Sequence, residues 1–312
     1  AVAGRNMYFM GDLAKRTIGY IKDKTSVGLE GAFDTLLRGK NGRIMQQRMS
    51  GQIWRPIQIG NNQPPVNGKD IVTTLDVRIQ DIAQYSLQKG LEAESADHGC
   101  VIVMETKTGA IKAIANLTRG EDNKYYETQN YAVSEFTEPG STFKVVSAIA
   151  LLEDGYVKPN DSIDNNWGKW TWYDKPWEDS KKPPKRFYTL GECLQYSSNI
   201  GTSKFVMQHY KKNPEKFTNH ILDLGLNVKP KFDIPSSNNP TIPTPEDASW
   251  SGTSLPSLSI GYSSNLSPLQ ILMLYNTIAN KGRMMQPYMV KEIRLEGQTL
   301  SKIEPIVLKE KA

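Results

Sequence analysis

A long amphipathic helix followed directly by two strand-like runs is the feature that most constrains how this chain can fold. The spacing of apolar residues predicts a helix over residues 77–93, and Asp76 is well placed to cap its N-terminus. Strands are expected at 100–105 and 110–115, joined by the turn Thr106-Lys107-Thr108-Gly109. A short turn between two such runs predicts a hairpin.

The rest of the chain consists of further helices separated by irregular segments. Helices are expected at residues 12–21, 32–38, 141–154, about 190–208 and 268–279, and weak strands at 288–308. Two segments rich in Pro, 156–188 and 233–256, are expected to be loops, and four tryptophans lie in the first of them. Because strands and helices do not alternate regularly, we expect an α+β fold.

Length and composition indicate a folded protein of about two domains. The chain has 312 residues, of which 38% are apolar and 23% are charged, so it can bury a core and is not disordered overall. The Pro-, Asn- and Gly-rich stretch from residue 55 to 68 is the best linker candidate. We therefore expect a small module over residues 1–67 and a larger domain over residues 68–312.

Charge and metal-ligand content argue against several classes of function. The net charge is only +5, and the densest basic group, at residues 181–186, is interrupted by two prolines, so no nucleic-acid partner is expected. The three histidines and two cysteines lack the spacing of a metal site, and no metal or cofactor is expected. Cys100 and Cys193 are expected to be buried thiols, although a disulfide between them is possible.

The segment Glu138-Pro139-Gly140-Ser141-Thr142-Phe143-Lys144 places a serine and a lysine on one face at the start of a helix. Serine becomes a nucleophile when a neighbouring base removes its proton. Lysine can be that base when burial or a nearby positive charge lowers its pKa. The ordinary alternative is a serine cap followed by an exposed lysine, which the Ser-x-x-Lys spacing alone does not exclude.

A second polar element, Ser197-Ser198-Asn199, follows at a helix-like position. A hydroxyl and a carboxamide two residues apart can relay a proton and hold a substrate amide, whereas surface polarity before a helix cap is the ordinary alternative. Ser-x-x-Lys followed by Ser-x-Asn is the motif order of the serine acyltransferases that bind penicillin.

Further segments make the chain resemble the class B penicillin-binding proteins, the D,D-transpeptidases of peptidoglycan synthesis. The matching segments, in family order, are residues 28–31, 36–39, 73–80, 101–115, 259–262 and 266–270. Trp250-Ser251 resembles the septal, cell-division branch more than the elongation branch. The resemblance implies a penicillin-binding transpeptidase domain, related in fold to serine β-lactamases, with part of a non-catalytic pedestal module before it.

The resemblance also implies roles for four residues. Ser141 would be the acylated nucleophile and Lys144 its base, while Ser197 would pass a proton to the leaving D-alanine and Asn199 would bind the substrate amide. The Ser141 backbone N–H would form half of the oxyanion hole. The reaction would be acyl transfer from a D-Ala-D-Ala stem peptide to an amine of a neighbouring strand, and β-lactams would block it.

A third family motif, Lys-Thr/Ser-Gly, does not occur where the resemblance requires it. The only literal Lys-Thr-Gly, at residues 107–109, precedes Ser141 and lies in the expected hairpin turn, so we interpret it as unrelated to the site. No such motif follows Gln270. We therefore expect a fragment that lacks the C-terminal Lys-Thr/Ser-Gly segment and forms little or no stable adduct with penicillin.

The membrane relationship of the protein is also expected from the resemblance. The longest nearly apolar run, residues 145–152, is too short for a membrane span, and no signal peptide opens the chain. The family implies an anchor in the cytoplasmic membrane upstream of Ala1 and a catalytic domain outside the cytoplasm. It also implies lipid-linked precursors, a membrane glycosyltransferase and other division proteins as partners.

Two other functions remain open at this point. A non-catalytic scaffold with a degenerate transpeptidase domain would lack Lys-Thr/Ser-Gly even in an extended reading frame. A β-lactam sensor or a β-lactamase also contains Ser-x-x-Lys, but neither is expected to carry the pedestal module. A β-lactamase would hydrolyse a chromogenic cephalosporin quickly. The Trp-rich segment at 156–188 either overhangs the cleft or packs on its own domain.

Overall fold

The computed structural model describes residues 13–22, 25–51, 53–57, 62–236 and 238–311. The chain forms two compact units. The first comprises Ala1–Asn130, Lys231–Pro235 and Met285–Val307, and the second comprises Tyr131–Pro230, Ser236–Met284 and Leu308–Ala312. These units reflect packing alone, and the functional boundary between residues 67 and 68 stays a prediction.

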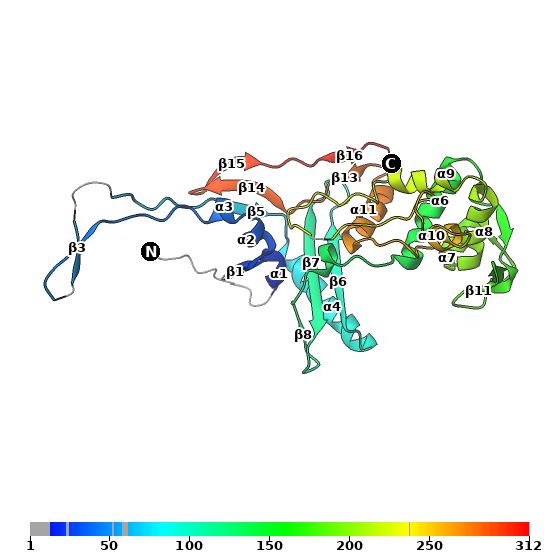
Figure 1. Ribbon diagram of the computed structural model, residues 1–312, viewed down its shortest axis with the longest axis horizontal. Coiled ribbons are helices and arrows are strands. Elements are labelled where there is room, and N and C mark those ends of the chain that lie inside the picture. Colours follow the sequence, from blue (N-terminus) through cyan, green and yellow to red (C-terminus); the bar gives the residue numbers. More distant parts are fainter. Residues whose placement is uncertain (1–12, 23–24, 52, 58–61, 237, 312) are drawn as a thin grey trace. The chain divides into compact units, whose positions relative to one another are not determined.

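The first unit contains an antiparallel sheet with one long helix against it (Figure 1). Strand β6 (His98–Met104) pairs with β7 (Ile111–Arg119), which also pairs with the short β8 (Tyr125–Tyr126). Helix α4 (Val77–Glu94) packs along β6 and β7. This arrangement confirms the helix and the strand pair that the sequence predicts.

The residues of α4 and those just before it explain where this helix begins and which of its faces is buried. The Asp76 carboxylate accepts hydrogen bonds from the backbone N–H groups of Arg78 (2.9 Å) and Ile79 (3.1 Å), which confirms the predicted cap. The helix buries its apolar stripe against the sheet. The buried residues of this small core are Ala83, Leu87, Leu91, Ala113, Ala115 and Leu117.

Shorter elements make up the remainder of the first unit. The helices are α1 (Lys15–Ile18), α2 (Gly28–Ala32) and α3 (Asp34–Leu37). The strands are β1 (Tyr20–Lys22), β2 (Thr25–Val27), β3 (Gln46–Arg48), β4 (Trp54–Pro56), β5 (Asp70–Thr73), β14 (Val290–Leu295) and β15 (Gln298–Lys302). Strands β15, β14 and β5 form a three-stranded antiparallel sheet in that order, and β14 and β15 confirm strand structure after residue 288. The short strands β13 (Met284–Met285) and β16 (Val307–Lys309) form another two-stranded sheet.

Two helices predicted in this unit are shorter than expected. The helix expected over residues 12–21 is only the single turn α1, because Gly19 (φ +88°) ends it. A Cβ on Gly19 would lie 1.7 Å from the Val27 carbonyl oxygen, so only glycine fits there. The proposed cap Asp12 lies outside the described residues. The helix expected over 32–38 is divided into α2 and α3, since Phe33 departs from helical geometry (φ −107°, ψ 17°).

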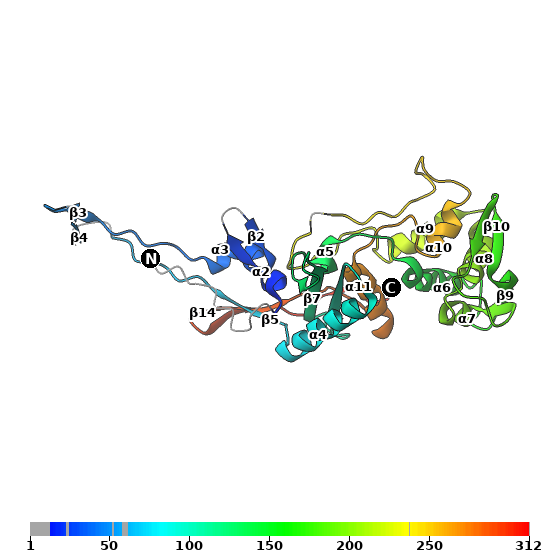
Figure 2. The ribbon, with the colours of Figure 1, turned by 90° about the horizontal axis from the view of Figure 1, so that it is seen from below.

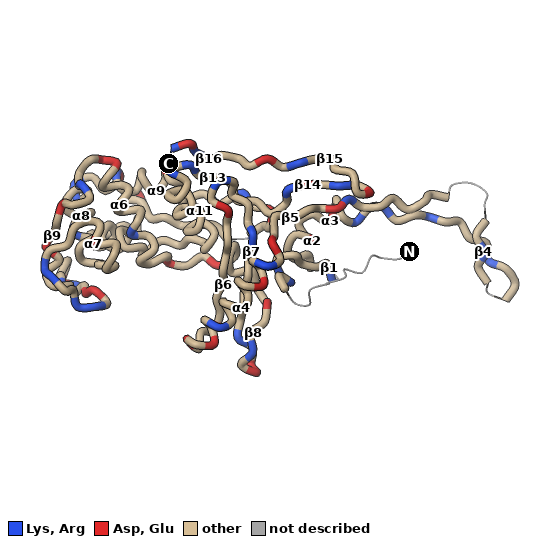
Figure 3. Tube along the Cα trace, turned by 180° about the vertical axis from the view of Figure 1, so that it is seen from behind, with Lys and Arg blue, Asp and Glu red and all other residues tan. Residues whose placement is uncertain are grey.

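A basic hairpin segment, residues 38–69, links α3 to β5 and contains the antiparallel pair β3–β4. The segment carries six Lys or Arg residues and no Asp or Glu, so it is locally basic, although Lys and Arg also occur along the rest of the chain (Figure 3). Six large apolar side chains on its described residues are 45 to 62% exposed: Ile44, Met45, Met49, Ile53, Trp54 and Val66. An exposed two-stranded ribbon with apolar and basic side chains is typical of a surface that contacts another molecule.

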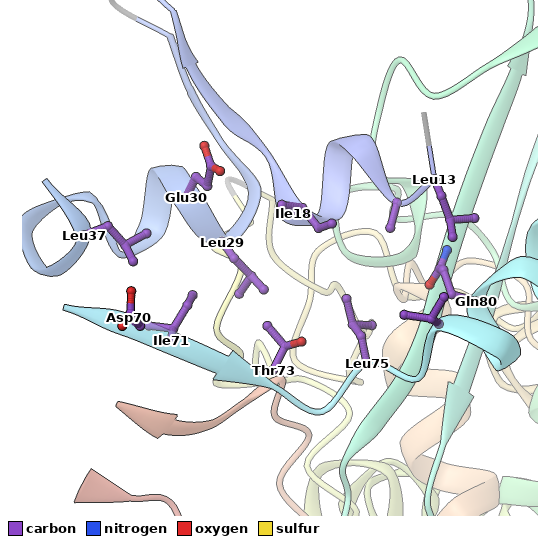
Figure 4. A pocket seen from close by; sticks show the side chains of 12 residues that line it. Leu13, Ile18, Leu29, Glu30, Leu37, Asp70, Ile71, Thr73, Leu75 and Gln80 are labelled. Carbon is purple, nitrogen blue, oxygen red and sulfur yellow. The ribbon is translucent and has the colours of Figure 1, made fainter. Parts of the chain in front are cut away.

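The first unit also contains a pocket of about 370 Å³ (Figure 4). Its lining is mostly aliphatic and comes chiefly from α1, α2, β5 and the start of α4, with Leu29 and Ile71 among the residues that line it. Glu30 and Asp70 are the acidic residues of the lining.

The second unit is built around helix α8 (Asn199–Tyr210), as Figure 2 shows. Four helices pack against it: α6 (Lys144–Glu153), α7 (Leu190–Gln195), α9 (Pro214–Asp223) and α10 (Ser254–Ser259). Two others, α5 (Tyr131–Ser134) and α11 (Pro268–Ala279), pack together. Its fully or nearly fully buried core includes Phe143, Val146, Leu151, Phe205, Tyr210, Phe217, Leu258 and Leu274. Helix α11 has the bounds predicted from the sequence.

The Trp-rich segment at 156–188 is not the loop that the sequence predicts. It contains β9 (Ser162–Asp164), η2 (Asn166–Gly168), β10 (Lys169–Trp172), β11 (Lys175–Glu178) and β12 (Phe187–Thr189). Strands β10 and β11 form a hairpin in which Trp170 faces Trp177. The Trp172 indole donates to the Gly252 carbonyl (3.0 Å), and both Trp170 and Trp172 pack on the core of their own unit. Cross-strand aromatic pairing and this burial explain the regular structure.

The cysteines only partly match expectation. Cys193 is buried, whereas Cys100 is half-buried, and these two residues, both within described segments, form no disulfide. No helix in the described part of the chain is both long and apolar enough to cross a membrane.

Candidate active site

Ser141 lies in a tight 3₁₀ turn, η1 (Gly140–Phe143), immediately before α6. The prediction that Ser141 is within the first turn of an α-helix is therefore wrong. A 3₁₀ turn has three residues per turn, so residues i and i+3 stand directly above each other, and Ser141 and Lys144 still share one side. The fully buried Phe143 side chain anchors the turn in the core, while Ser141 itself is exposed.

Lys144 is the centre of the site. Its side chain is 1% exposed, and its Nζ lies 3.0 Å from Ser141 Oγ. The same nitrogen lies 2.9 Å from Ser197 Oγ and 2.6 Å from the Ser197 carbonyl oxygen. Three acceptors match the three N–H donors of an ammonium group. The structure thus brings Ser141, Lys144 and Ser197, three of the four residues proposed from the sequence, into direct contact.

Burial prepares Lys144 to lose a proton. It lowers the pKa of the Lys144 ammonium to about 8, because a low-dielectric environment disfavours the charged form. The negative charge of Asp179 opposes this shift and favours the ammonium. At neutral pH a minority of Lys144 side chains is therefore in the neutral form, which can accept a proton.

Ser197 occupies a break between two helices rather than the middle of one. The single helix expected over about 190–208 is wrong, since α7 ends at Gln195 and α8 begins at Asn199. Ser197 adopts a left-handed conformation (φ +54°), which is uncommon for a residue other than glycine. Backbone N–H groups fix the break, because Ser198 donates to the Cys193 carbonyl at 2.9 Å. Such conformations cluster at functional sites.

Asn199 is the first residue of α8 and is half-buried. Its side-chain amide donates to the Glu178 carbonyl at 3.4 Å. Asn199 therefore lies two residues beyond Ser197 on the same turn, and in this structure its side chain is directed to the strand β11 rather than to Lys144.

The segment 259–263 is hydrogen-bonded to the residues just before Ser141. The Gly140 N–H donates to the Gly261 carbonyl (3.1 Å), and the Ser263 N–H donates to the Glu138 carboxylate (2.7 Å). Gly261 has φ +86°, and a Cβ there would lie 2.1 Å from the Gly140 carbonyl oxygen, so a larger residue would displace the turn. This contact gives the Gly-Tyr segment found in the sequence a physical role.

Sequence reasoning missed Asp179, which follows strand β11. Its carboxylate accepts hydrogen bonds from Ser198 Oγ (2.7 Å) and from the backbone N–H groups of Asn199 (2.6 Å) and Ile200 (3.0 Å). An acidic residue inside a segment expected to be a loop gives no signal of such a contact in one sequence.

Lys107-Thr108-Gly109 lies in the β6–β7 turn of the first unit, as predicted.

The described residues contain no group of three or more His, Cys, Asp or Glu side chains that could hold a metal ion.

Residues 99–311 match the model of the penicillin binding protein transpeptidase domain. The chain belongs to this family. It is 30% identical to penicillin-binding protein PbpB of Mycobacterium tuberculosis, over 90% of this chain and 42% of that protein. It is 28% identical to the probable peptidoglycan D,D-transpeptidase PenA of Neisseria meningitidis, over 88% of this chain and 47% of that protein.

Solved structures of penicillin-binding proteins have the same fold. Penicillin-binding protein 3 of M. tuberculosis, complexed with ampicillin, matches with a TM-score of 0.76 at 26% identity, covering 96% of this chain and 63% of that one. The α+β transpeptidase fold expected from the sequence is thereby confirmed. The chain spans less than half the length of the two curated relatives above.

Proposed function

We propose that this chain carries the acyl-transfer site of a peptidoglycan D,D-transpeptidase of the septal type. The observation that carries the proposal is the buried Lys144 amine in hydrogen-bond contact with the Ser141 and Ser197 hydroxyls at once. A nucleophile and a second proton carrier, each within 3.0 Å of the nitrogen that serves as the base, form the geometry that activated-serine chemistry requires. The septal assignment rests on the resemblance of Trp250-Ser251.

Acylation follows from this geometry. Neutral Lys144 takes the proton of Ser141 Oγ, which attacks the carbonyl carbon of the penultimate D-alanine of a stem peptide. The peptide C–N bond then breaks, and Ser197 Oγ passes a proton to the leaving D-alanine amine and is reprotonated from Lys144. The Ser141 backbone N–H stabilises the oxyanion, a contribution of about 2.7–4 kcal/mol per donor in related chemistry.

Transfer to the second strand reverses these steps. An amine of a neighbouring stem peptide attacks the carbonyl carbon of the Ser141 ester and gives up a proton to Lys144. The bond between this carbon and Ser141 Oγ breaks, Ser141 Oγ regains a proton from Lys144, and the new amide bond is the cross-link. Asn199 binds the substrate amide, which requires its side chain to leave the Glu178 carbonyl. A β-lactam follows the first step only, because its opened ring keeps the leaving amine attached. The likeness to a relative complexed with ampicillin supports this part of the proposal.

The whole protein is proposed to be anchored in the cytoplasmic membrane with this site outside the cytoplasm. Its partners would be lipid-linked precursors, a membrane glycosyltransferase and other division proteins. The basic hairpin segment supports such contacts, because its exposed apolar and positively charged side chains suit a protein partner. The name of the relative PenA, a probable peptidoglycan D,D-transpeptidase, supports the proposed reaction and does not mention these partners.

Release of D-alanine tests the proposed reaction. The protein expressed from its complete gene is supplied with lipid-linked precursor and a peptidoglycan glycosyltransferase. We expect one D-alanine to be released per cross-link formed, because each acylation expels one, and we expect a β-lactam to suppress both products. D-Alanine is measured with a coupled oxidase, and cross-linked dimers are measured by chromatography of digested glycan.

The control is the same mixture with Ser141→Ala protein. A folded wild-type protein that forms neither product, yet binds the glycosyltransferase, would instead indicate a scaffold. Rapid hydrolysis of a chromogenic cephalosporin would indicate a β-lactam-hydrolysing protein.

A further inference from the structure

Asp179 ties the hairpin β10–β11 to the turn that carries Ser197. One carboxylate oxygen accepts from Ser198 Oγ at 2.7 Å, and the other accepts from the N–H groups of Asn199 (2.6 Å) and Ile200 (3.0 Å). Its own N–H donates to the Gly168 carbonyl (2.9 Å), which holds Asp179 in place from the other side.

These contacts act on the break between α7 and α8. Ser198 is 1% exposed and caps α8 by accepting from the Gly201 N–H at 2.9 Å. Asp179 satisfies the first two orphan N–H groups of this 12-residue helix, those of Asn199 and Ile200, where the helix dipole favours a negative charge. The turn is thus fixed on both sides of Ser198, and the left-handed Ser197 before it has little freedom to move.

We propose that Asp179 is a positioning residue for the acyl transfer, holding the Ser197–Asn199 turn so that Ser197 Oγ stays on Lys144. The proposal rests on the proposed function of Ser141 and Lys144. Asp179 acts through its neighbours: its carboxylate contacts Ser198, Asn199 and Ile200, while Lys144 contacts Ser141 and Ser197.

The charge of Asp179 has a second effect that a purely structural contact would not have. The titratable groups that act on Lys144 are Asp179 and the Cys193 thiol, and Glu192 acts on Cys193 in turn. Burial raises the pKa of the Cys193 thiol to about 12, so this group is neutral at working pH. Asp179 is therefore the anionic group that favours the Lys144 ammonium.

The test compares Asp179→Asn with a matched control, Asp174→Asn. Asparagine keeps the size of the side chain but removes the charge and presents an N–H donor where an acceptor is needed. Asp174 is exposed in the turn of the same hairpin, where its φ of +56° suits asparagine equally well. Both variants are made in the protein expressed from its complete gene, and thermal unfolding checks that each is folded.

Two readouts are measured. We expect Asp179→Asn to slow acylation by a fluorescent penicillin about 10²-fold, because misplaced groups cost that much in rate, and Asp174→Asn to match wild type. We also expect the pKa of Lys144, measured by NMR of ¹³Cε-labelled lysine, to be lower in Asp179→Asn only. The acid limb of the acylation rate then shifts to lower pH.

The outcomes separate this proposal from the proposed function. Failure of the wild-type protein to be labelled would refute the function, whereas the Lys144 pKa would still report on Asp179. An Asp179→Asn protein with wild-type rate, or with an unchanged Lys144 pKa, would overturn the positioning role.

Discussion

Replacing Lys144 by methionine is expected to slow acylation by penicillin about 10²–10⁴-fold while the protein stays folded. Methionine is unbranched and apolar, so it fills the space of a side chain that is 1% exposed without leaving a buried charge. Ser141 Oγ then has no base within hydrogen-bond distance among the contacts it makes now. The rate constant is measured with a fluorescent penicillin on the protein expressed from its complete gene.

The same base predicts the pH dependence of the wild-type rate. Burial lowers the pKa of Lys144 to about 8, and only the neutral amine accepts a proton, so the rate falls as the pH drops below about 8.

Lys89→Met is the matched control for Lys144→Met, since Lys89 is an exposed residue of α4 in the first unit. Acylation of Lys144→Met within threefold of wild type would contradict the assignment of the base.

The largest effect on stability is expected for Phe217→Ala, at about 3–5 kcal/mol of unfolding free energy. Phe217 lies in α9, is 0% exposed, and packs against the Tyr210 ring with centroids 5.4 Å apart. Alanine leaves a cavity between α9 and α8, and the surrounding helices relax only partly. Urea unfolding followed by tryptophan fluorescence suits this test, because five of the six tryptophans lie in the second unit.

Phe187→Ala is the control for this prediction. Phe187 is 54% exposed in β12 of the same unit, so its loss is expected to cost less than about 1 kcal/mol. Equal losses for the two variants would show that the core of the second unit is not packed as described.

Helices with strong end signals could be predicted from the sequence. Asp76 before α4, and Ser267 before α11 with Pro268 at its first position, give explicit starts, and both helices begin where these residues indicate. Breaks inside apolar periodic segments could not be predicted. The run through Ser197 keeps a helical pattern, and the turn there also involves tertiary hydrogen bonds from residues 198–200 to Asp179.

In the candidate site, too, residues close together in the sequence could be predicted, whereas contacts between distant residues could not. Ser141 and Lys144 were found because the Ser-x-x-Lys motif, only four residues long, is visible in one sequence. Their contact with Ser197 needed the family resemblance, since 53 residues separate Lys144 from it. Asp179 was missed because neither motif nor periodicity marks a carboxylate that folds back on a turn 19 to 21 residues away.

The central claim is that Ser141 Oγ forms the acyl-enzyme. Its most direct test is mass spectrometry of the penicillin-treated protein, expressed from its complete gene and digested to peptides. We predict a single penicilloyl adduct on Ser141 and none in Ser141→Ala. An adduct on Ser197 or another residue, or one that persists in Ser141→Ala, would contradict the claim.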